Sequence, residues 1–228
     1  MQHITTRKKA EERLMTSLRE KESLVQELQH RVMNNLQFAS SLLALQTPNL
    51  RDEWDRKLVR ESLNRFTTMA IIHEDLYYSP DHSRIDFTSC VRNLATHLIE
   101  SRSRNLPAVD LRITAGDMLL DMDIAIPCGL IMAELVDIAL QHAFTGEHAS
   151  PGEVCIQVEA TPTRLHLSVK DNGKGLPEGF ELTNAPSFGF RMIRLLAEQL
   201  DAVIEVSSGV GTAVTISCQR ATTGRRQE

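Results

Sequence analysis

One histidine stands in a helix-forming stretch that also contains an arginine and two asparagines. The stretch ELQHRVMNNLQ places His30 beside Arg31, with Asn34 and Asn35 about one helical turn later. A histidine imidazole is a good nucleophile near neutral pH. His30 is therefore a candidate for covalent chemistry, and the alternative is a solvated histidine on the surface of a long helix.

A second candidate site follows an expected strand. The segment RLHLSVKD (164–171) alternates as a strand does and leads into the glycine-rich loop NGKGLPEGF. A carboxylate at the end of a strand, here Asp171, can accept a hydrogen bond from an exocyclic amine, and glycines let a ring or a phosphate approach the backbone. An ordinary turn explains the same residues if nothing else in the chain matches.

Other segments accompany this loop along the chain. The helical stretch ELVDIALQHAF (134–144) precedes it, and SFGFRMIRLLAEQL (187–200) follows it with a glycine at the start of a helix. Backbone N–H groups and the helix dipole favour phosphate at such a helix start. The segment GVGTAVTI then closes the chain as a strand. These pieces together indicate a nucleotide site.

The combined pattern resembles the sensor histidine kinases, specifically the subclass with the acceptor motif HRxxNN (HWE-like, or second HisKA class). The resemblance depends on ELQHRVMNNLQFASSLLALQ, SLNRFTTMAIIHEDLY, IPCGLIMAEL and SVKDNGKGLPEGF, and it covers about residues 20–218. The second half resembles the Bergerat-type (GHKL) ATPases. The resemblance implies a two-component enzyme that phosphorylates its own histidine with ATP and passes the phosphoryl group to a response-regulator aspartate.

In the first half, the resemblance implies that His30 accepts the phosphoryl group as a phosphoramidate. Arg31, Asn34 and Asn35 would form its neighbourhood. Asn34 lies one turn beyond His30 on the same helix face, where it would hydrogen-bond the phosphoryl group or orient a water. Many histidine kinases have an acid at the position of Arg31. Because arginine cannot act as a base, Glu27 is a candidate proton acceptor.

In the second half, the resemblance implies that Asp171 binds the adenine amine. Glu134 would act near the γ-phosphate as a catalytic group and weak metal ligand, and Gly189 would let a helix N-terminus approach the phosphates. The other ATP-binding residues that the resemblance implies are Asn172, Gly173, Gly175, His142 and Thr212. ATP is thus the expected cofactor, with Mg²⁺ as its companion.

The metal-binding position departs from the family pattern. The helix that usually has the sequence ELVxNAxKH is ELVDIALQH here, so Ile138 replaces the Mg²⁺-binding asparagine and Gln141 replaces the lysine. Mg²⁺ requires oxygen ligands, which isoleucine lacks. Asp137 is adjacent, but it points about 100° away around the helix. A second departure, LDA for LGG at 200–202, is expected to alter only a turn.

Two functions therefore compete. The first is a working histidine kinase with an atypical metal site and weakened use of ATP and Mg²⁺. The second is a histidine phosphotransferase, phosphatase or scaffold that binds a response regulator while its ATPase half is degenerate. A plain dimerisation module is a third, structural alternative. The kinase is favoured because the Asp171 motif is intact, and disuse would be expected to erode it.

The first half must hold His30 on a helical scaffold. Residues 5–46 contain neither proline nor glycine, and residues 52–78 form a second helical stretch after the break at TPN. Both have apolar residues at helical spacing, which predicts a hairpin. A lone hairpin buries too little apolar surface, so we expect two copies to form a four-helix bundle in a homodimer.

The second half must hold the nucleotide site on an α/β layer. Helices are expected at 87–104, 124–143 and 187–200, and strands at 108–114, 153–160 and 164–171 with a closing hairpin, AVIEVSS and GTAVTISC. This pattern predicts a mixed sheet with helices on one face. The fold class is therefore α plus α/β, a dimeric helical hairpin followed by an α/β sandwich ATP-binding domain.

We expect four parts along the chain. They are a helical linker at 1–20, the dimerisation and phosphoacceptor hairpin at 21–80, the Bergerat-type domain at 86–218 and a disordered tail at 219–228. The linker resembles the helical tail that leaves a PAS sensor domain. We therefore expect either a fragment of a longer sensor kinase or a kinase that a PAS or other sensor partner controls in trans.

Composition excludes several classes of partner. The net charge of −5 does not favour nucleic acid or an anionic membrane, and the longest apolar run, IAIPCGLIMAELV, is too short and interrupted to span a bilayer. Four widely spaced cysteines form no CxxC pair, which indicates reduced thiols. With no apolar leader at the N-terminus, a cytoplasmic bacterial protein is expected.

Overall fold

The computed structural model describes residues 2–50, 52–77, 79, 84–102, 109–145, 151–177, 179–182 and 187–220. The chain forms two compact units, Met1–Ser83 and Arg84–Glu228. The first unit is helical and the second contains a sheet. The predicted order, a helical region followed by an α/β domain, is therefore confirmed.

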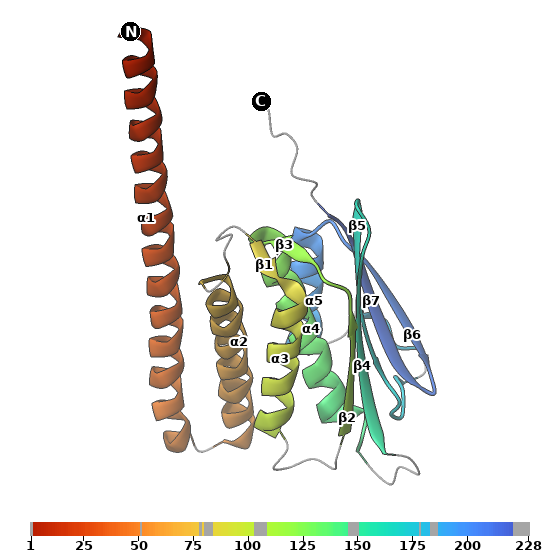
Figure 1. The fold of residues 1–228 in the computed structure, drawn as a ribbon. Helices are drawn as coiled ribbons and strands as arrows, with labels where there is room; N and C mark the ends of the chain where they lie inside the picture. Colours follow the sequence, from red (N-terminus) through yellow and green to blue (C-terminus); the bar gives the residue numbers. More distant parts are fainter. Residues whose placement is uncertain are drawn as a thin grey trace. The chain divides into compact units, whose positions relative to one another are not determined.

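The first unit is a helical hairpin. Helix α1 (Gln2–Gln46) runs without interruption, and a 3₁₀ turn η1 (Thr47–Asn49) with a proline near its start separates it from α2 (Glu53–Tyr77). The carboxylate of Asp52 accepts the N–H of Trp54 at 2.9 Å, which caps the start of α2. Because α1 is continuous, the expected linker at 1–20 and the first hairpin helix are one element (Figure 1).

The two faces of α1 differ in exposure. Less exposed side chains recur at helical spacing along α1, and they include Gln29, Met33, Leu36, Ser40 and Leu43. Helix α1 packs against α2 within this unit. A neighbouring face remains exposed although it is apolar; it comprises Leu14, Leu18, Leu28, Val32 and Leu42, which we call the apolar stripe. The hairpin therefore leaves apolar surface that its own described residues do not cover.

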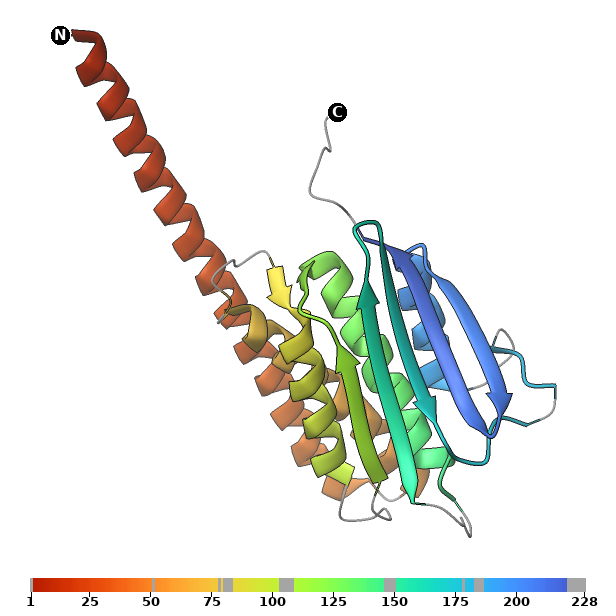
Figure 2. The same cartoon turned by 45° about the vertical axis from the view of Figure 1, so that its right-hand side comes forward.

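The second unit is built on a five-stranded mixed sheet in the order β2-β4-β5-β7-β6 (Figure 2). Strand β2 (Val109–Ala115) is parallel to β4 (Gly152–Ala160), and the other pairs are antiparallel. The remaining strands are β5 (Arg164–Asp171), β6 (Val203–Gly209) and β7 (Gly211–Gln219). Strand β5 is the central strand, so its last residue, Asp171, has a strand on either side.

Three helices cover one face of this sheet: α3 (Phe87–Arg102), α4 (Met122–His142) and α5 (Phe188–Gln199) (Figure 1). Alternate residues of the central strands are buried beneath them, such as Val154, Ile156 and Val158 in β4. Most side chains of α4 are also buried. A helix that is apolar nearly all round belongs in the interior, and α4 therefore forms the centre of the helical layer.

Several details differ from the sequence-based expectation. Strands β1 (Arg84–Asp86) and β3 (Leu119–Asp121) pair with each other, and each is too short to show a period in sequence. Asp201 adopts φ 48°, a left-handed conformation at the turn after α5, where the motif LGG of the kinases that the sequence resembles has glycine.

The expected tail at 219–228 also needs correction. Gln219 pairs with Arg164 at the end of β7, and Arg220 donates to the carbonyls of Thr163 and Leu119. These two residues therefore belong to the sheet domain, and the rest of the tail lies outside the described residues. Among the described helices, none is long and apolar enough to cross a membrane.

The central strand provides a test of the fold. Leu167 in β5 is 1% exposed, so we expect Leu167→Ala to lower the free energy of unfolding by about 2–5 kcal/mol through lost burial and a residual cavity. Lys170→Ala, on the exposed side of the same strand, should change it by less than about 0.5 kcal/mol. Urea unfolding followed by circular dichroism measures both changes in free energy. Equal effects would contradict the assignment of Leu167 to the buried face of β5 and Lys170 to its exposed face.

Candidate functional site

His30 lies on an exposed part of α1 and has an amide beside it. The Asn34 side-chain nitrogen and His30 Nδ1 are 3.2 Å apart and hydrogen-bonded. An amide offers both a donor and an acceptor, so by turning over it can bind either neutral tautomer of the ring. When Nδ1 holds the proton, the lone pair on Nε2 is available. As placed, the amide N–H donates to Nδ1 and the ring proton belongs on Nε2; with the amide turned over, Nδ1–H donates to the amide oxygen and the Nε2 lone pair is the candidate nucleophile.

The other predicted neighbours of His30 lie on the same helix. Arg31 forms an ion pair with Glu27, one turn earlier, and both side chains are exposed. The carboxylate that was the candidate proton acceptor is therefore bound to a guanidinium. Asn35 is exposed as well. Of the four predicted residues, the structure brings Asn34 directly to the imidazole of His30.

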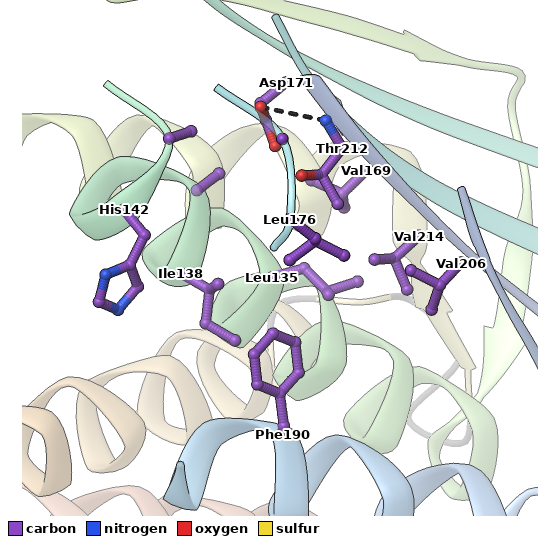
Figure 3. Close-up of a pocket in the computed structure, with 13 residues that line it drawn as sticks. Leu135, Ile138, His142, Val169, Asp171, Leu176, Phe190, Val206, Thr212 and Val214 are labelled. Atoms are coloured by element: carbon purple, nitrogen blue, oxygen red, sulfur yellow. Dashed lines mark hydrogen bonds between the residues drawn. The ribbon is translucent and has the colours of Figure 1, made fainter. Parts of the chain in front are cut away.

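In the second unit, Asp171 ends β5 with a buried carboxylate that is 6% exposed. Its Oδ1 accepts the backbone N–H of Gly173 at 2.9 Å. It also accepts that of Thr212 at 3.3 Å, which Figure 3 shows as a dashed line. Burial raises the pKa of Asp171 above its usual value, and the hydrogen bonds from Gly173 and Thr212 oppose this effect. The two backbone donors orient the carboxylate at the edge of a pocket.

Two glycines allow the backbone to approach Asp171 this closely. Gly211 has φ +85°, and a Cβ there would lie 1.9 Å from the carbonyl oxygen of Asp171. A Cβ on Gly173 would lie 2.4 Å from the carbonyl oxygen of Ala143 at the end of α4. Sequence reasoning selected Gly173 but missed Gly211, although the GxGT pattern before β7 was a visible signal. Both positions require glycine for close backbone contact.

The pocket beside Asp171 has mainly apolar walls (Figure 3). Helix α4, strands β5, β6 and β7, helix α5 and the loop after β5 all contribute, and the lining residues are Leu135, Ile138, Ala139, His142, Ala143, Val169, Asp171, Gly175, Leu176, Phe190, Val206, Thr212 and Val214. Apolar walls with one oriented acceptor suit a flat heteroaromatic ring that has an amino group. The apolar residues were missed because they look like core in sequence.

The predicted residue Asn172 has a different role. Its Oδ1 accepts the N–H of Glu153 at 2.7 Å, and its Nδ2 donates to the carbonyl of Pro151 at 3.0 Å. The side chain thus holds the start of β4 and is absent from the described pocket lining. Asn172 therefore supports the strand beside Asp171, and its part in binding the nucleotide stays a prediction.

Glu134 and Ile138 lie where α4 meets the start of α5. A Cβ added to Gly189 would be 2.8 Å from Glu134 Oε2 and 3.4 Å from Ile138 Cδ1. Glu134 is 7% exposed. Ser187 caps α5, since its hydroxyl accepts the N–H of Phe190 at 3.4 Å. The buried carboxylate of Glu134 therefore lies against the first turn of α5.

The residues around Ile138 do not fit an octahedral Mg²⁺ site. Ile138 lines the pocket with carbon atoms, and Gln141 Nε2 donates to Asp137 Oδ2 at 2.6 Å. Asp137 is not among the described lining residues, as its place on the helix predicts. Within the described part of the chain, no three His, Cys, Asp or Glu side chains cluster as metal ligands. Glu134 is the carboxylate near this end of the pocket.

Comparison with known families matches both halves of the chain. Residues 27–102 match the family model described as histidine kinase, and residues 123–222 match the model described as histidine kinase-, DNA gyrase B- and HSP90-like ATPase. The first match contains His30 with its neighbours, and the second contains Asp171 with the pocket. These are the two regions that the resemblance in sequence had indicated.

Curated relatives agree with this assignment. The sensor histidine kinase PdtaS of Mycolicibacterium smegmatis is 33% identical over 215 residues, which are 92% of this chain and 42% of that protein. PdtaS of Mycobacterium tuberculosis is 32% identical over 79% of this chain and 36% of its own length. The chain thus spans about two fifths of the length of these relatives.

Solved structures support the fold. The histidine kinase domain from the Erythrobacter litoralis EL346 blue-light activated histidine kinase aligns with a TM-score of 0.62 at 22% identity, over 78% of this chain and 93% of that chain. The Acinetobacter baumannii histidine kinase AdeS aligns at 0.52 and 15% identity, over 83% of this chain and 97% of that one. From the two family matches and these relatives, the chain belongs to the histidine kinases with a gyrase- and HSP90-like ATPase domain.

Proposed function

We propose that this chain is the kinase portion of a two-component signalling protein. ATP binds in the Asp171 pocket, its γ-phosphoryl group moves to His30, and an aspartate in a response-regulator receiver domain then accepts it. The main support is the buried, doubly hydrogen-bonded Asp171 carboxylate within an apolar pocket of an ATPase-family fold. A phosphotransferase that takes no phosphate from ATP would have no need to keep this acceptor oriented.

Adenine recognition follows from the position of Asp171. The exocyclic amine of adenine donates to the carboxylate, while the ring lies between apolar side chains such as Leu135, Ala139 and Val214. Thr212 supports the same carboxylate from the neighbouring strand through its backbone N–H. The carboxylate is oriented before the ligand arrives, so little ordering of this side chain opposes binding.

Phosphoryl transfer uses Nε2 of His30, in the tautomer that carries the ring proton on Nδ1. The Nε2 lone pair attacks the γ-phosphorus, the bond from phosphorus to the bridging oxygen breaks, and ADP leaves with that electron pair. A ring nitrogen bonded to phosphorus needs the other nitrogen to lose its proton, and solvent can take it because His30 is exposed. Asn34 keeps the ring in one orientation during this exchange.

A homodimer fits the apolar stripe on α1. Leu28 and Val32 are 62% and 39% exposed although both are apolar and on one helix face. Pairing the stripe with that of a second chain removes this surface from water. A response-regulator receiver and a sensor domain, upstream or in a separate chain, are the other partners of the proposed kinase. His30, Arg31 and Asn34 are all exposed on α1, where a receiver domain can approach them.

Use of Mg²⁺ is proposed to be weakened. Mg²⁺ needs oxygen ligands, and the helix offers Ile138 where the family has asparagine. Glu134 alone supplies a carboxylate at this end of the pocket. Autophosphorylation is therefore expected to be slow, and replacing the isoleucine with asparagine supplies the missing ligand.

His30 is tested by incubation with γ-labelled ATP. We expect label on the parent protein and none on His30→Ala, because the nucleophile is then absent. His166→Ala is the matched control, since His166 bonds Ser217 on the sheet at 2.8 Å and should leave labelling unchanged. An unlabelled parent that takes phosphate from a phosphorylated receiver would instead show the phosphotransferase.

Asp171 is tested by Asp171→Asn, which keeps the shape and the two backbone hydrogen bonds. We expect adenine-nucleotide affinity to fall about 10- to 100-fold, because an amide donor would face the donating amine. Lys170→Ala on the same strand is the control. Calorimetry measures both, and unchanged affinity in Asp171→Asn would remove Asp171 from the site.

The same variant gives a pH signature. Burial raises the folded-state pKa of Asp171 above the usual 3.8, so its contribution to stability is present below 3.8 and is lost as pH rises through the folded value. The parent should thus lose stability relative to Asp171→Asn across this interval. Urea unfolding from pH 3 to 7 measures the difference, and a difference of opposite sign would show that the hydrogen bonds outweigh burial.

The dimer is tested by Leu28→Glu combined with Val32→Glu. The two substitutions remove apolar burial in both chains that contributes about 3 kcal/mol to association. The dissociation constant of the dimer should therefore rise by about two orders of magnitude. Gln37→Glu adds charge to an exposed position outside the stripe and should leave it unchanged. Sedimentation over a range of concentrations measures this. A parent that is monomeric throughout would exclude the stripe as the interface.

A further inference from the structure

We propose that Asn35 meets the Asn35 of a second copy of this chain at the centre of the dimer interface, where the two amides set the register of the paired hairpins. The inference rests on the homodimer of the proposed function. It goes further because it names the residue that aligns the two copies along the helix axis. When the copies are aligned, the two His30 side chains lie at the same height on the dimer.

The apolar stripe on α1 belongs to a seven-residue repeat. Leu14, Leu28 and Leu42 are separated by 14 residues, which is two repeats. Val25 and Val32 are seven residues apart, and Val25 precedes Leu28 by three residues. Leucine at one position and a β-branched residue three positions before it favour two parallel helices in a coiled coil. The stripe therefore fits α1 of a second chain, running in the same direction.

Asn35 is a polar residue within this repeat. It is exposed, and it stands seven residues after Leu28 and seven before Leu42, at the position of the repeat that these leucines share. Because it follows His30 by five residues, its side chain points about 140° away from the imidazole around the helix, whereas Asn34 points only about 40° away. Asn35 therefore lies with the apolar stripe and faces away from the phosphoacceptor.

A second polar residue in the repeat, Lys21, is less suited to set the register. It stands 14 residues before Asn35 and is exposed. Two lysine ammonium groups repel each other, and each can reach water along a flexible apolar stem. Lysines at this position are therefore accommodated in several alignments, and Asn35 is the residue whose hydrogen bonding depends on the alignment.

Further apolar rows indicate where the other helices of the dimer lie. Leu24, Phe38 and Leu45 follow the same repeat beside the stripe, and they are 60%, 65% and 71% exposed. Helix α2 also has exposed apolar side chains near its start, Trp54 at 67% and Leu58 at 38%. In a two-fold four-helix bundle, the α2 of each copy covers such a row on the α1 of the other. A second copy of this chain is thus the occupant that both surfaces fit.

Parallel pairing about a two-fold axis brings each residue of the stripe opposite its own copy. A side-chain amide has both donors and an acceptor, so the nitrogen of one Asn35 can donate to the oxygen of the other. A shift by one repeat, about 10 Å along the axis, would instead place each amide against a leucine. The buried amide would then lack a partner, which is unfavourable. Asn35 therefore favours one register, whereas an all-leucine row would allow more than one.

The first measurement is the dissociation constant of the dimer, by sedimentation of the full chain over a range of concentrations. In Asn35→Leu we expect this constant to fall at least about 10-fold, because leucine removes a polar group from an apolar interface. Gln37→Leu makes a similar change at an exposed position outside the stripe and should leave the constant unchanged. An unchanged or higher constant in Asn35→Leu would place Asn35 outside the interface.

The second measurement is the register, by disulfide cross-linking with copper phenanthroline and oxygen as the oxidant. Chains with Val25→Cys are mixed with tagged chains with Val32→Cys, and a mixed disulfide requires a shift of one repeat. While Asn35 is present, we expect disulfides between like positions and less than about a tenth of the mixed product. With Asn35→Leu in both chains, the mixed product should rise to at least about a third. The unmodified chain is the control, because its four cysteines lie outside the hairpin.

The outcomes separate this inference from the proposed function. If like-position disulfides form and Asn35→Leu leaves the register unchanged, the dimer stands and Asn35 does not set the register. If Asn35→Leu abolishes labelling of His30 while the register stays the same, Asn35 belongs to the phosphoacceptor neighbourhood instead. If the parent is monomeric and forms no such disulfide, the proposed dimer itself fails, while labelling of His30 by ATP still tests the kinase. Circular dichroism checks that each variant retains its helices.

Discussion

The nucleotide half of the protein depends on one buried carboxylate. Asp171 ends the central strand, and its Oδ1 accepts N–H groups from Gly173 and Thr212. Burying an anion is unfavourable unless donors surround it, and its raised pKa shows that burial still predominates over the donors. The protein thus maintains a polar group at some cost in stability in order to present an acceptor within apolar walls.

Helix α4 connects this acceptor to the opposite end of the pocket. Leu135 and Ala139 line the pocket beside Asp171, while Glu134 and Ile138 meet the first turn of α5. Because α4 is buried on most of its surface, its side chains are held by packing on every side. Under the proposed function, isoleucine at residue 138 therefore alters the chemistry of the phosphate end and leaves the adenine end intact.

In the proposed function, the hairpin and the ATPase unit carry out different steps. In that proposal the hairpin presents the nucleophile, and His30 lies on an exposed part of α1, hydrogen-bonded to Asn34 on the next turn. The ATPase unit needs a closed pocket and buries its functional carboxylate.

The sequence alone determined the order of the long helices and strands, because periods of 3.6 and 2 are properties of local segments. It also indicated His30 and Asp171, since motifs place them at a helix turn and a strand end. The tertiary structure decided what segments far apart in the chain do together: Gly211 approaching Asp171, Glu134 meeting Gly189, and Asn172 turning to β4. Such contacts depend on the packing of α4, α5 and the sheet, which no local pattern encodes.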